Sequence, residues 1–130
     1  MLKRGLYGTG LLLLAIGGLG FVMGSPLFGL LEVDRTHNWT HVVSGVLVLW
    51  YSLKSEERMR LFARVFGFVY FLAGVLGFLV PDGDFFAIMF VNLPDNVLHL
   101  ALGAALFLMG YYRRKKPPEP SADPASPVSA

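Results

Sequence analysis

The sequence predicts an all-α integral membrane protein, a four-helix bundle made of two helical hairpins with both termini in the cytoplasm. Its 130 residues are 55% hydrophobic and only 15% charged, whereas a water-soluble domain carries about 25% charged residues. Long uncharged segments separate the charges, and lysine and arginine collect at alternate ends of these segments. Cysteine is absent, which excludes disulfide scaffolds, thiolate metal sites and cysteine nucleophiles.

The four expected helices follow from the uncharged segments. A spanning helix needs about 20 mostly apolar residues, with a range of roughly 17–25. Uncharged segments of that length cover residues 5–31, 36–53, 65–81 and 96–112. We therefore expect spanning helices over residues 6–24, 37–53, 61–81 and 95–112. The uncharged segment 85–94 is too short to cross a bilayer.

These helices are expected to form one domain, residues 1–116, followed by a tail at residues 117–130. The tail has the sequence PPEPSADPASPVSA and holds five prolines. Proline at this density prevents helix and strand, and the tail has few apolar side chains to bury. We expect it to be a disordered cytoplasmic segment.

The basic residues give the expected orientation in the cell membrane. With both termini inside, ten of the 11 lysines and arginines face the cytoplasm and Arg35 faces out, as the positive-inside rule requires. Some of the inner residues are expected to contact anionic lipid headgroups. These are Arg58, Arg60, Arg64, Arg113, Arg114, Lys115 and Lys116. The bilayer thus accounts for the net charge of +2, and no nucleic-acid partner is expected.

An internal repeat relates the two halves of the chain at an offset of 58 residues. The pattern N-x-x-H-x-x-x-G occurs twice, at Asn38, His41 and Gly45 and at Asn96, His99 and Gly103. The short apolar segments 27–31 and 85–91 precede it, and we expect both to cover the outer mouth of the bundle. Both halves run the same way through the membrane, which predicts parallel repeats related by an axis along the membrane normal.

Small residues in the expected helices allow neighbouring helices to approach closely. The glycines that we expect at helix contacts are Gly20, Gly24, Gly45, Gly77 and Gly103. Helix faces of this kind also favour association with a second copy of the chain or with a larger membrane complex.

The stretch FVNLPDNVLHLALGAALFLMG, residues 90–110, resembles a bacterial family of small four-helix membrane proteins catalogued only as a domain of unknown function. The family signature VN-x-x-DN-x-LH-x-x-LG is matched from Val91 to Gly103, and an earlier N-x-x-H helix is matched by Asn38 and His41. The resemblance covers about residues 6–112 and departs at His37, where an apolar residue is expected. It implies the fold and the membrane location, and it implies no activity.

The polar residues of the repeat form the candidate site. In a structural interpretation, Asn38 and Asn96 cap their helices while His41 and His99 hydrogen-bond across the bundle. In a second interpretation, His41 and His99 supply the two axial ligands of a haem b. In a third, a divalent metal ion is bound. Its ligands would be His37, His41, Asp95 and His99.

The sequence predicts a non-enzymatic membrane protein, a structural or assembly component. No serine lies in a nucleophile-elbow motif, and no Asp or Glu lies near the centre of an expected span. These absences disfavour nucleophilic catalysis and carboxylate-mediated proton transport. The alternative is a small redox subunit that binds haem or a metal through the paired histidines. A transporter of a small solute has only the repeat in its favour.

Overall fold

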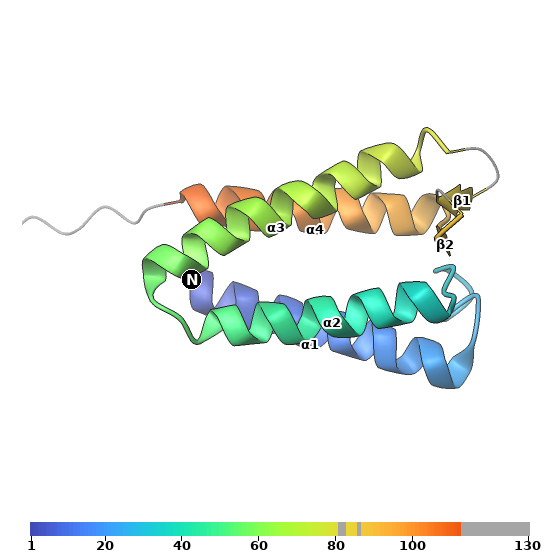
Figure 1. The fold of residues 1–130 in the computed structure, drawn as a ribbon, viewed down its shortest axis with the longest axis horizontal. Coiled ribbons are helices and arrows are strands. Elements are labelled where there is room, and N and C mark those ends of the chain that lie inside the picture. The colour runs from blue at the N-terminus through green and yellow to red at the C-terminus, as the bar shows by residue number, and fades with distance from the viewer. Residues whose placement is uncertain (81–82, 86, 113–130) are drawn as a thin grey trace, which may run out of the picture.

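The computed structural model describes residues 1–80, 83–85 and 87–112, which form four helices and one two-stranded sheet (Figure 1). The helices are α1 (Leu2–Met23), α2 (Arg35–Ser52), α3 (Glu56–Gly77) and α4 (Leu93–Tyr111). Strands β1 (Asp84–Phe85) and β2 (Met89–Phe90) are antiparallel, with Asp84 opposite Phe90 and Phe85 opposite Met89. The expected tail and the basic residues Arg113, Arg114, Lys115 and Lys116 lie outside the described residues.

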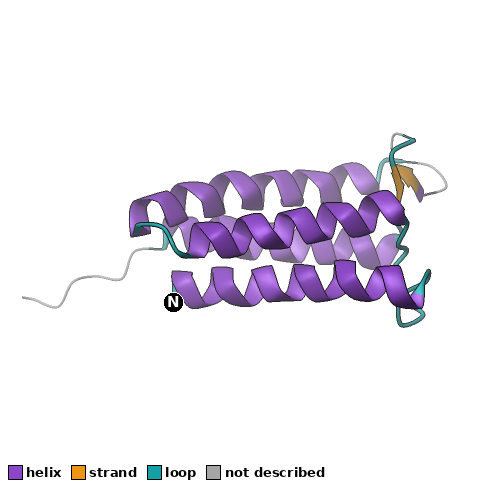
Figure 2. Cartoon of the chain, turned by 60° about the horizontal axis from the view of Figure 1, so that its bottom comes forward, coloured by secondary structure: helices purple, strands orange, loops and turns teal. Residues whose placement is uncertain are grey.

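The four helices lie side by side as two antiparallel hairpins, α1–α2 and α3–α4 (Figures 1 and 2). The first residues of α2 and α4 and the two strands lie at one end of the bundle, which we call the histidine end (Figure 1). The opposite end, which holds Met1 and Tyr112, is called the terminal end.

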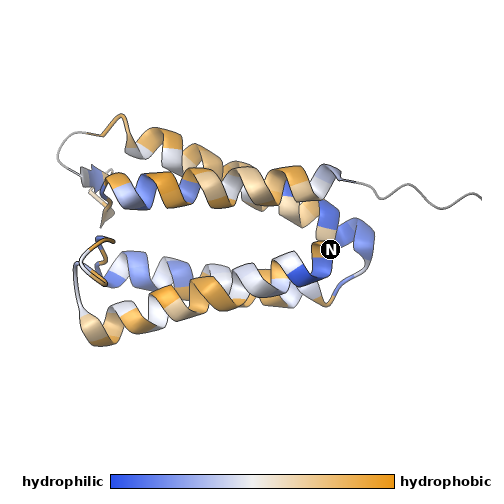
Figure 3. Cartoon of the chain, turned by 180° about the vertical axis from the view of Figure 1, so that it is seen from behind, coloured by the Kyte–Doolittle hydropathy of each residue, from blue (hydrophilic) through white to orange (hydrophobic). Residues whose placement is uncertain are grey.

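Three of the helices, α1, α3 and α4, are long and apolar enough to cross a membrane. The predicted all-α fold with membrane-spanning helices is confirmed to this extent. Helix α2 does not reach the same hydropathy because its first two turns carry Arg35, His37, Asn38 and His41. The crossing expected at residues 37–53 therefore stays a prediction. Figure 3 shows mostly apolar residues along the middle of the helices and more hydrophilic residues toward the two ends of the bundle.

The starts of α2 and α4 correct the expected N-caps. Helix α2 is capped by Asp34, whose side chain accepts a hydrogen bond from the backbone N–H of His37. Helix α4 is capped by Asn92. The expectation that Asn38 and Asn96 cap these helices is wrong, because each lies one turn inside its helix. Aspartate and asparagine are both strong N-caps, and here the earlier residue of each pair starts the helix.

Helix α3 also begins earlier than expected, at Glu56 instead of residue 61, and it ends at Gly77 instead of residue 81. Its first turn carries Glu56 and Glu57. Carboxylates stabilise the positive end of the helix dipole, which accounts for the extra turn at this start. The prediction located the apolar part of the helix from the charges alone. It therefore placed the start at residue 61, which lies inside the observed helix.

Glycines bring the two helices of each hairpin into backbone contact. A Cβ added to Gly45 of α2 would lie 2.9 Å from the carbonyl oxygen of Gly10 in α1. A Cβ added to Gly103 of α4 would lie 2.7 Å from the carbonyl oxygen of Gly67 in α3. Such separations leave no room for a side chain, so the helices pack closely at Gly45 and Gly103.

Two further glycines accommodate the asparagines of the repeat. A Cβ added to Gly20 would lie 2.0 Å from Oδ1 of Asn38, and one added to Gly77 would lie 1.9 Å from Oδ1 of Asn96. The expectation that Gly24 packs against a helix is wrong. Gly24 follows the end of α1 with φ of 76°, and no atom lies within 4 Å of its added Cβ. With ψ of −173°, it ends the helix in a positive-φ conformation that glycine alone adopts readily.

A core shared by all four helices joins the two hairpins. Its most buried members are Leu6 and Leu13 of α1, Val48 of α2, Ala63 of α3 and Leu106 of α4. A smaller cluster closes the histidine end below the segment 27–31. It contains Ile16, Leu27 and Val33, with Leu31 and Leu98 packed against them. The segment 27–31 therefore covers this end of the bundle, as expected.

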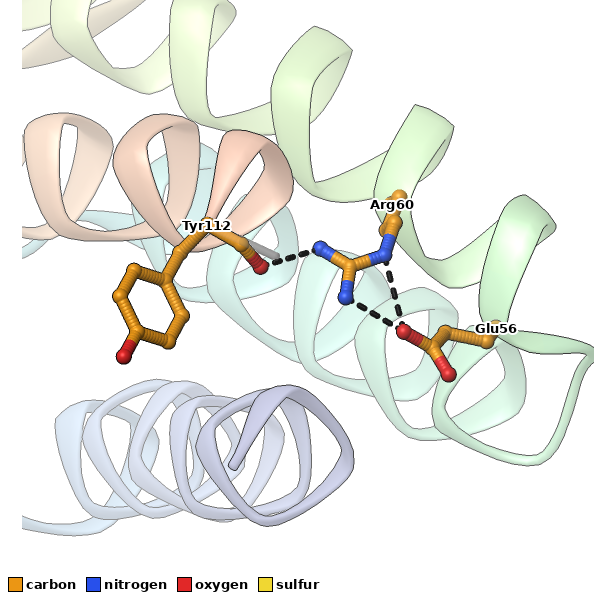
Figure 4. Close-up of polar contacts among 3 residues, drawn as sticks. All are labelled: Glu56, Arg60 and Tyr112. Carbon is orange, nitrogen blue, oxygen red and sulfur yellow. Dashed lines mark hydrogen bonds and ion pairs between the residues drawn. The ribbon is translucent and has the colours of Figure 1, made fainter. Parts of the chain in front are cut away.

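At the terminal end, Arg60 connects the start of α3 to the end of α4 (Figure 4). Its guanidinium donates to the Glu56 carboxylate and to the carbonyl oxygen of Tyr112. Arg64 lies over the Tyr111 ring at 4.9 Å and donates to the carbonyl oxygen of Arg60. Two of the residues expected to contact lipid headgroups thus also make contacts within the protein.

Candidate metal centre

Three histidines meet between the hairpins at the histidine end. His37 and His41 lie one turn apart on α2, and His99 faces them from α4. Their side chains are buried, with exposed fractions of 1%, 2% and 8%. One ring nitrogen from each lies within 4.8 Å of the other two. The ring centroids are 4.5 Å, 5.7 Å and 5.9 Å apart, so the three imidazoles form one compact cluster.

Backbone hydrogen bonds fix the orientation of His37. Its Nδ1 lies 3.1 Å from the carbonyl oxygen of Phe90, which can only accept, so Nδ1 carries the proton. Nε2 is then left with a free lone pair, and it is buried without a partner among the described residues. Phe90 is held in turn, because its N–H donates to Oδ2 of Asp34 at 2.6 Å. A histidine that donates one N–H to a carbonyl and presents the other nitrogen is the usual arrangement of a metal ligand.

His41 has the least satisfied side chain of the cluster. Within the described part of the chain, neither Nδ1 nor Nε2 of its buried ring has a hydrogen-bond partner. Leaving a buried polar group unsatisfied costs about 1–3 kcal/mol. The expected hydrogen bond from His41 across the bundle is therefore not formed among these residues. His99 contacts the edge of the Tyr70 ring, with the centroids 5.5 Å apart.

A cavity of about 120 Å³ adjoins the cluster. The three histidines line it together with apolar side chains, Tyr70 from α3, and Met89 from β2. A water molecule takes about 30 Å³ in the liquid, so the space suits a small ligand. A larger hollow of about 740 Å³ lies at the terminal end. That hollow is lined by Lys3, Glu56 and Arg60 and by apolar residues, and it is remote from the histidines.

The structure brings together only part of the expected site. His37, His41 and His99 converge, whereas the Asp95 carboxylate is engaged by the backbone N–H groups of Asn92 and Glu32, each at 3.0 Å. It therefore links the hairpins, because Glu32 belongs to the first half of the chain and Asp95 to the second.

The two asparagines of the repeat also stand outside the cluster. Their Oδ1 atoms are buried against Gly20 and Gly77 and have no hydrogen-bond partner among the described residues.

Tyr70 and Met89 also line the site, and the sequence analysis did not predict them. Tyr70 lies one turn from both Gly67 and Gly74, and that helical spacing is the signal that would have placed it on the inner face of α3.

The geometry accommodates one ion better than a haem. Axial ligation by His41 and His99 requires a flat macrocycle between their rings. The ring of His37 lies 4.5 Å from that of His41 and 5.7 Å from that of His99, so a macrocycle placed between those two rings would meet it. Three nitrogens that converge within 4.8 Å of one another instead suit a single small ion, once the rings move inward.

The fold and the cluster together define a class: an all-helical protein with membrane-spanning helices that enclose three buried histidines. The family described as Domain of unknown function (DUF4383) matches residues 3–112, so the chain belongs to this family. The predicted resemblance to a family of unknown function is thereby confirmed. No curated protein and no solved structure matches the chain.

Proposed function

We propose that this chain is a non-enzymatic, multi-pass protein of the cell membrane that binds one transition-metal ion between its two hairpins. The observation that carries the proposal is the convergence of three buried imidazoles, with one nitrogen of each within 4.8 Å of the others. Imidazole nitrogens bind divalent metals of the first transition row strongly. Three protein ligands leave one coordination position open, and the cavity beside the histidines accommodates it.

Binding requires only a small inward movement of the rings. Nitrogens at about 2.0–2.1 Å from a tetrahedral ion are about 3.4 Å apart, so separations of up to 4.8 Å close by at most about 1.4 Å for each pair. The ion would satisfy Nε2 of His37 and one nitrogen of His41, both of which are unpartnered among the described residues. A purely structural cluster leaves these groups unpaired, which is why the metal interpretation is preferred here.

The membrane arrangement that we propose has four crossings with both termini in the cytoplasm. Helix α2 packs along α1 from Gly10 and Gly45 to Gly20 and Asn38, so it lies at the same depth as the apolar helix α1. The basic residues near Arg4, Arg60 and the end of α4 then face the cytoplasm.

Matching contacts support the proposal that the two hairpins are parallel repeats. Gly20 packs against the side chain of Asn38, and Gly77 packs against the side chain of Asn96 in the same way. The N-caps Asp34 and Asn92 are separated by the same 58 residues as the two asparagines. Leu27 pairs with Leu31, and the residues 58 positions later, Phe85 and Met89, pair in the same antiparallel sense. We also propose that the exposed helix faces associate with a second copy of the chain or with a larger membrane complex.

Metal analysis of the purified protein tests the proposal. The full chain is prepared in mild detergent with a tag that contains no histidine, and metal content is measured by mass spectrometry after incubation with Zn²⁺ or Co²⁺. We expect one ion per chain, and Co²⁺ should give the visible absorption bands of a tetrahedral nitrogen site. His41→Ala and His99→Ala should lose the ion, whereas Thr36→Ala, an exposed change on α2, should keep it.

Variants that do not fold are replaced by His41→Gln and His99→Gln, which keep a polar side chain of similar size. Circular dichroism and gel filtration establish that each variant is folded before its metal content is compared. A wild-type protein that binds neither ion, or folded histidine variants that bind as wild type does, would refute the proposal. The structural or assembly interpretation would then account for the cluster.

Orientation is tested by labelling single cysteines, which is straightforward because the chain has none of its own. Asp84→Cys at the histidine end and Ser55→Cys at the opposite end are both at exposed positions. A membrane-impermeant maleimide added to intact cells should label the first variant only. Labelling of Ser55→Cys alone would reverse the proposed orientation.

A further inference from the structure

We infer that the ion bound at this site is copper in its +1 state, and that the thioether of Met89 supplies the fourth ligand. This inference rests on the metal site proposed above and names the metal that the site selects. It depends on two features of the surroundings: the presence of Met89 in the cavity wall and the low charge of the site.

Met89 lines the cavity beside the three histidines. It lies in β2 and is half-buried. Its position is set by the pairing of β1 with β2, in which Phe85 lies opposite Met89. The next residue, Phe90, accepts the hydrogen bond from His37, so the strand that carries the sulfur also orients one of the histidines. A thioether is a soft ligand, and soft ligands select Cu⁺ over harder ions.

The wall opposite the histidines offers little to a hard ion. Val69, Ala73 and Val91 line it with apolar groups. The nearby buried carboxylate, Asp95, accepts two backbone hydrogen bonds through Oδ2, and it is not among the residues that line the cavity. Ions such as Mg²⁺, Ca²⁺ and Mn²⁺ prefer carboxylate, carbonyl and water oxygens. Apart from the hydroxyls of Thr40 and Tyr70, the side-chain donor atoms of the lining residues are nitrogen and sulfur.

The charge of the site also favours a monovalent ion. Three neutral imidazoles and a thioether contribute no negative charge, and the histidines are at least nine-tenths buried. The cost of moving an ion into a medium of low dielectric constant rises with the square of its charge, so a +2 ion is penalised more than a +1 ion.

The experiment compares Cu⁺ and Zn²⁺ binding by the wild type and by Met89→Leu. Leucine has nearly the same volume and no donor atom, so the substitution removes the sulfur while keeping the packing. Met23→Leu is the matched control, because Met23 is exposed at the end of α1. Cu⁺ affinity is measured under anaerobic, reducing conditions by competition with a chromogenic Cu⁺ chelator, and Zn²⁺ affinity by competition with a Zn²⁺ chelator.

We expect Met89→Leu to lower Cu⁺ affinity by at least about tenfold, since even outer-shell changes cost about 10–100-fold. Its Zn²⁺ affinity should be unchanged, and Met23→Leu should match the wild type for both ions. X-ray absorption at the copper edge should show nitrogen and one sulfur in the wild type and in Met23→Leu. The sulfur should be absent from Met89→Leu.

Two outcomes overturn this inference while the proposed metal site stands. One is a wild-type copper site without sulfur, and the other is Cu⁺ affinity that Met89→Leu does not change. Failure of the wild type to bind any of the tested ions instead overturns the proposed function itself, and the inference with it.

Discussion

Replacement of Gly103 by alanine tests the close packing of α3 against α4. An added Cβ would lie 2.2 Å from the backbone nitrogen of Phe71, 2.6 Å from its Cα and 2.7 Å from the carbonyl oxygen of Gly67. All three atoms belong to the backbone of α3, so no side chain can rotate to make space. Ordinary contact begins at 3.4 Å. The shortest separation therefore falls about 1.2 Å short, and one helix must move.

Overpacking of this kind costs about 1–3 kcal/mol, and we expect the upper end because the obstacle is backbone. The reference variant is Gly18→Ala in α1, where no atom lies within 4 Å of the added Cβ. Both glycines lie inside helices, so both variants gain the same helix propensity, about 1 kcal/mol. The difference between them isolates the steric cost, for which we expect about 3 kcal/mol.

The assay is unfolding by sodium dodecyl sulfate in mixed micelles, followed by circular dichroism, with the free energy of unfolding compared between the two variants. Gly103→Ala should also weaken metal binding, because His99 lies one turn away on α4 and would move with it. Equal free energies of unfolding for Gly103→Ala and Gly18→Ala would refute the close approach of these helices.

Two further predictions concern the histidine end. Asp95→Asn should lower the free energy of unfolding by about 1.5–3 kcal/mol, because a buried charged acceptor of two backbone hydrogen bonds is lost. The exposed change Asp84→Asn should stay within about 0.5 kcal/mol of wild type, and similar losses for the two variants would contradict the link between the hairpins. Ala87→Gly should stabilise the chain by about 1 kcal/mol in thermal unfolding, because Ala87 has φ of 57°. Gly29→Ala, at φ of 71° with open space around it, should destabilise by about 1–2 kcal/mol, and no difference between the pair would disprove a left-handed conformation at Ala87.

The positions of the four helices could be predicted because uncharged length and charge placement are properties of single segments. The helix starts could not. Asp34 and Asn92 satisfy the 58-residue offset as well as Asn38 and Asn96 do, so the repeat does not tell which pair caps the helices.

Part of the site was also predictable. His37 and His41 share a helix face through their i, i+4 spacing, and the repeat brings His99 opposite them. The proton position on His37 depends on the Phe90 carbonyl, whose place is decided by the turn between β1 and β2. In strands of two residues, no periodic pattern in the sequence shows that Met89 faces the cavity.

The division of the contacts between and within the hairpins has a consequence for biogenesis. Contacts within each hairpin join residues that leave the ribosome close together, such as Gly10 and Gly45, so each hairpin can pair as soon as it is inserted. The histidine cluster instead joins α2 to α4, the last helix to be made. A chain that stops after α3 would hold the first hairpin intact and leave His37 and His41 without His99. The completed cluster therefore distinguishes a fully inserted chain from an unfinished one.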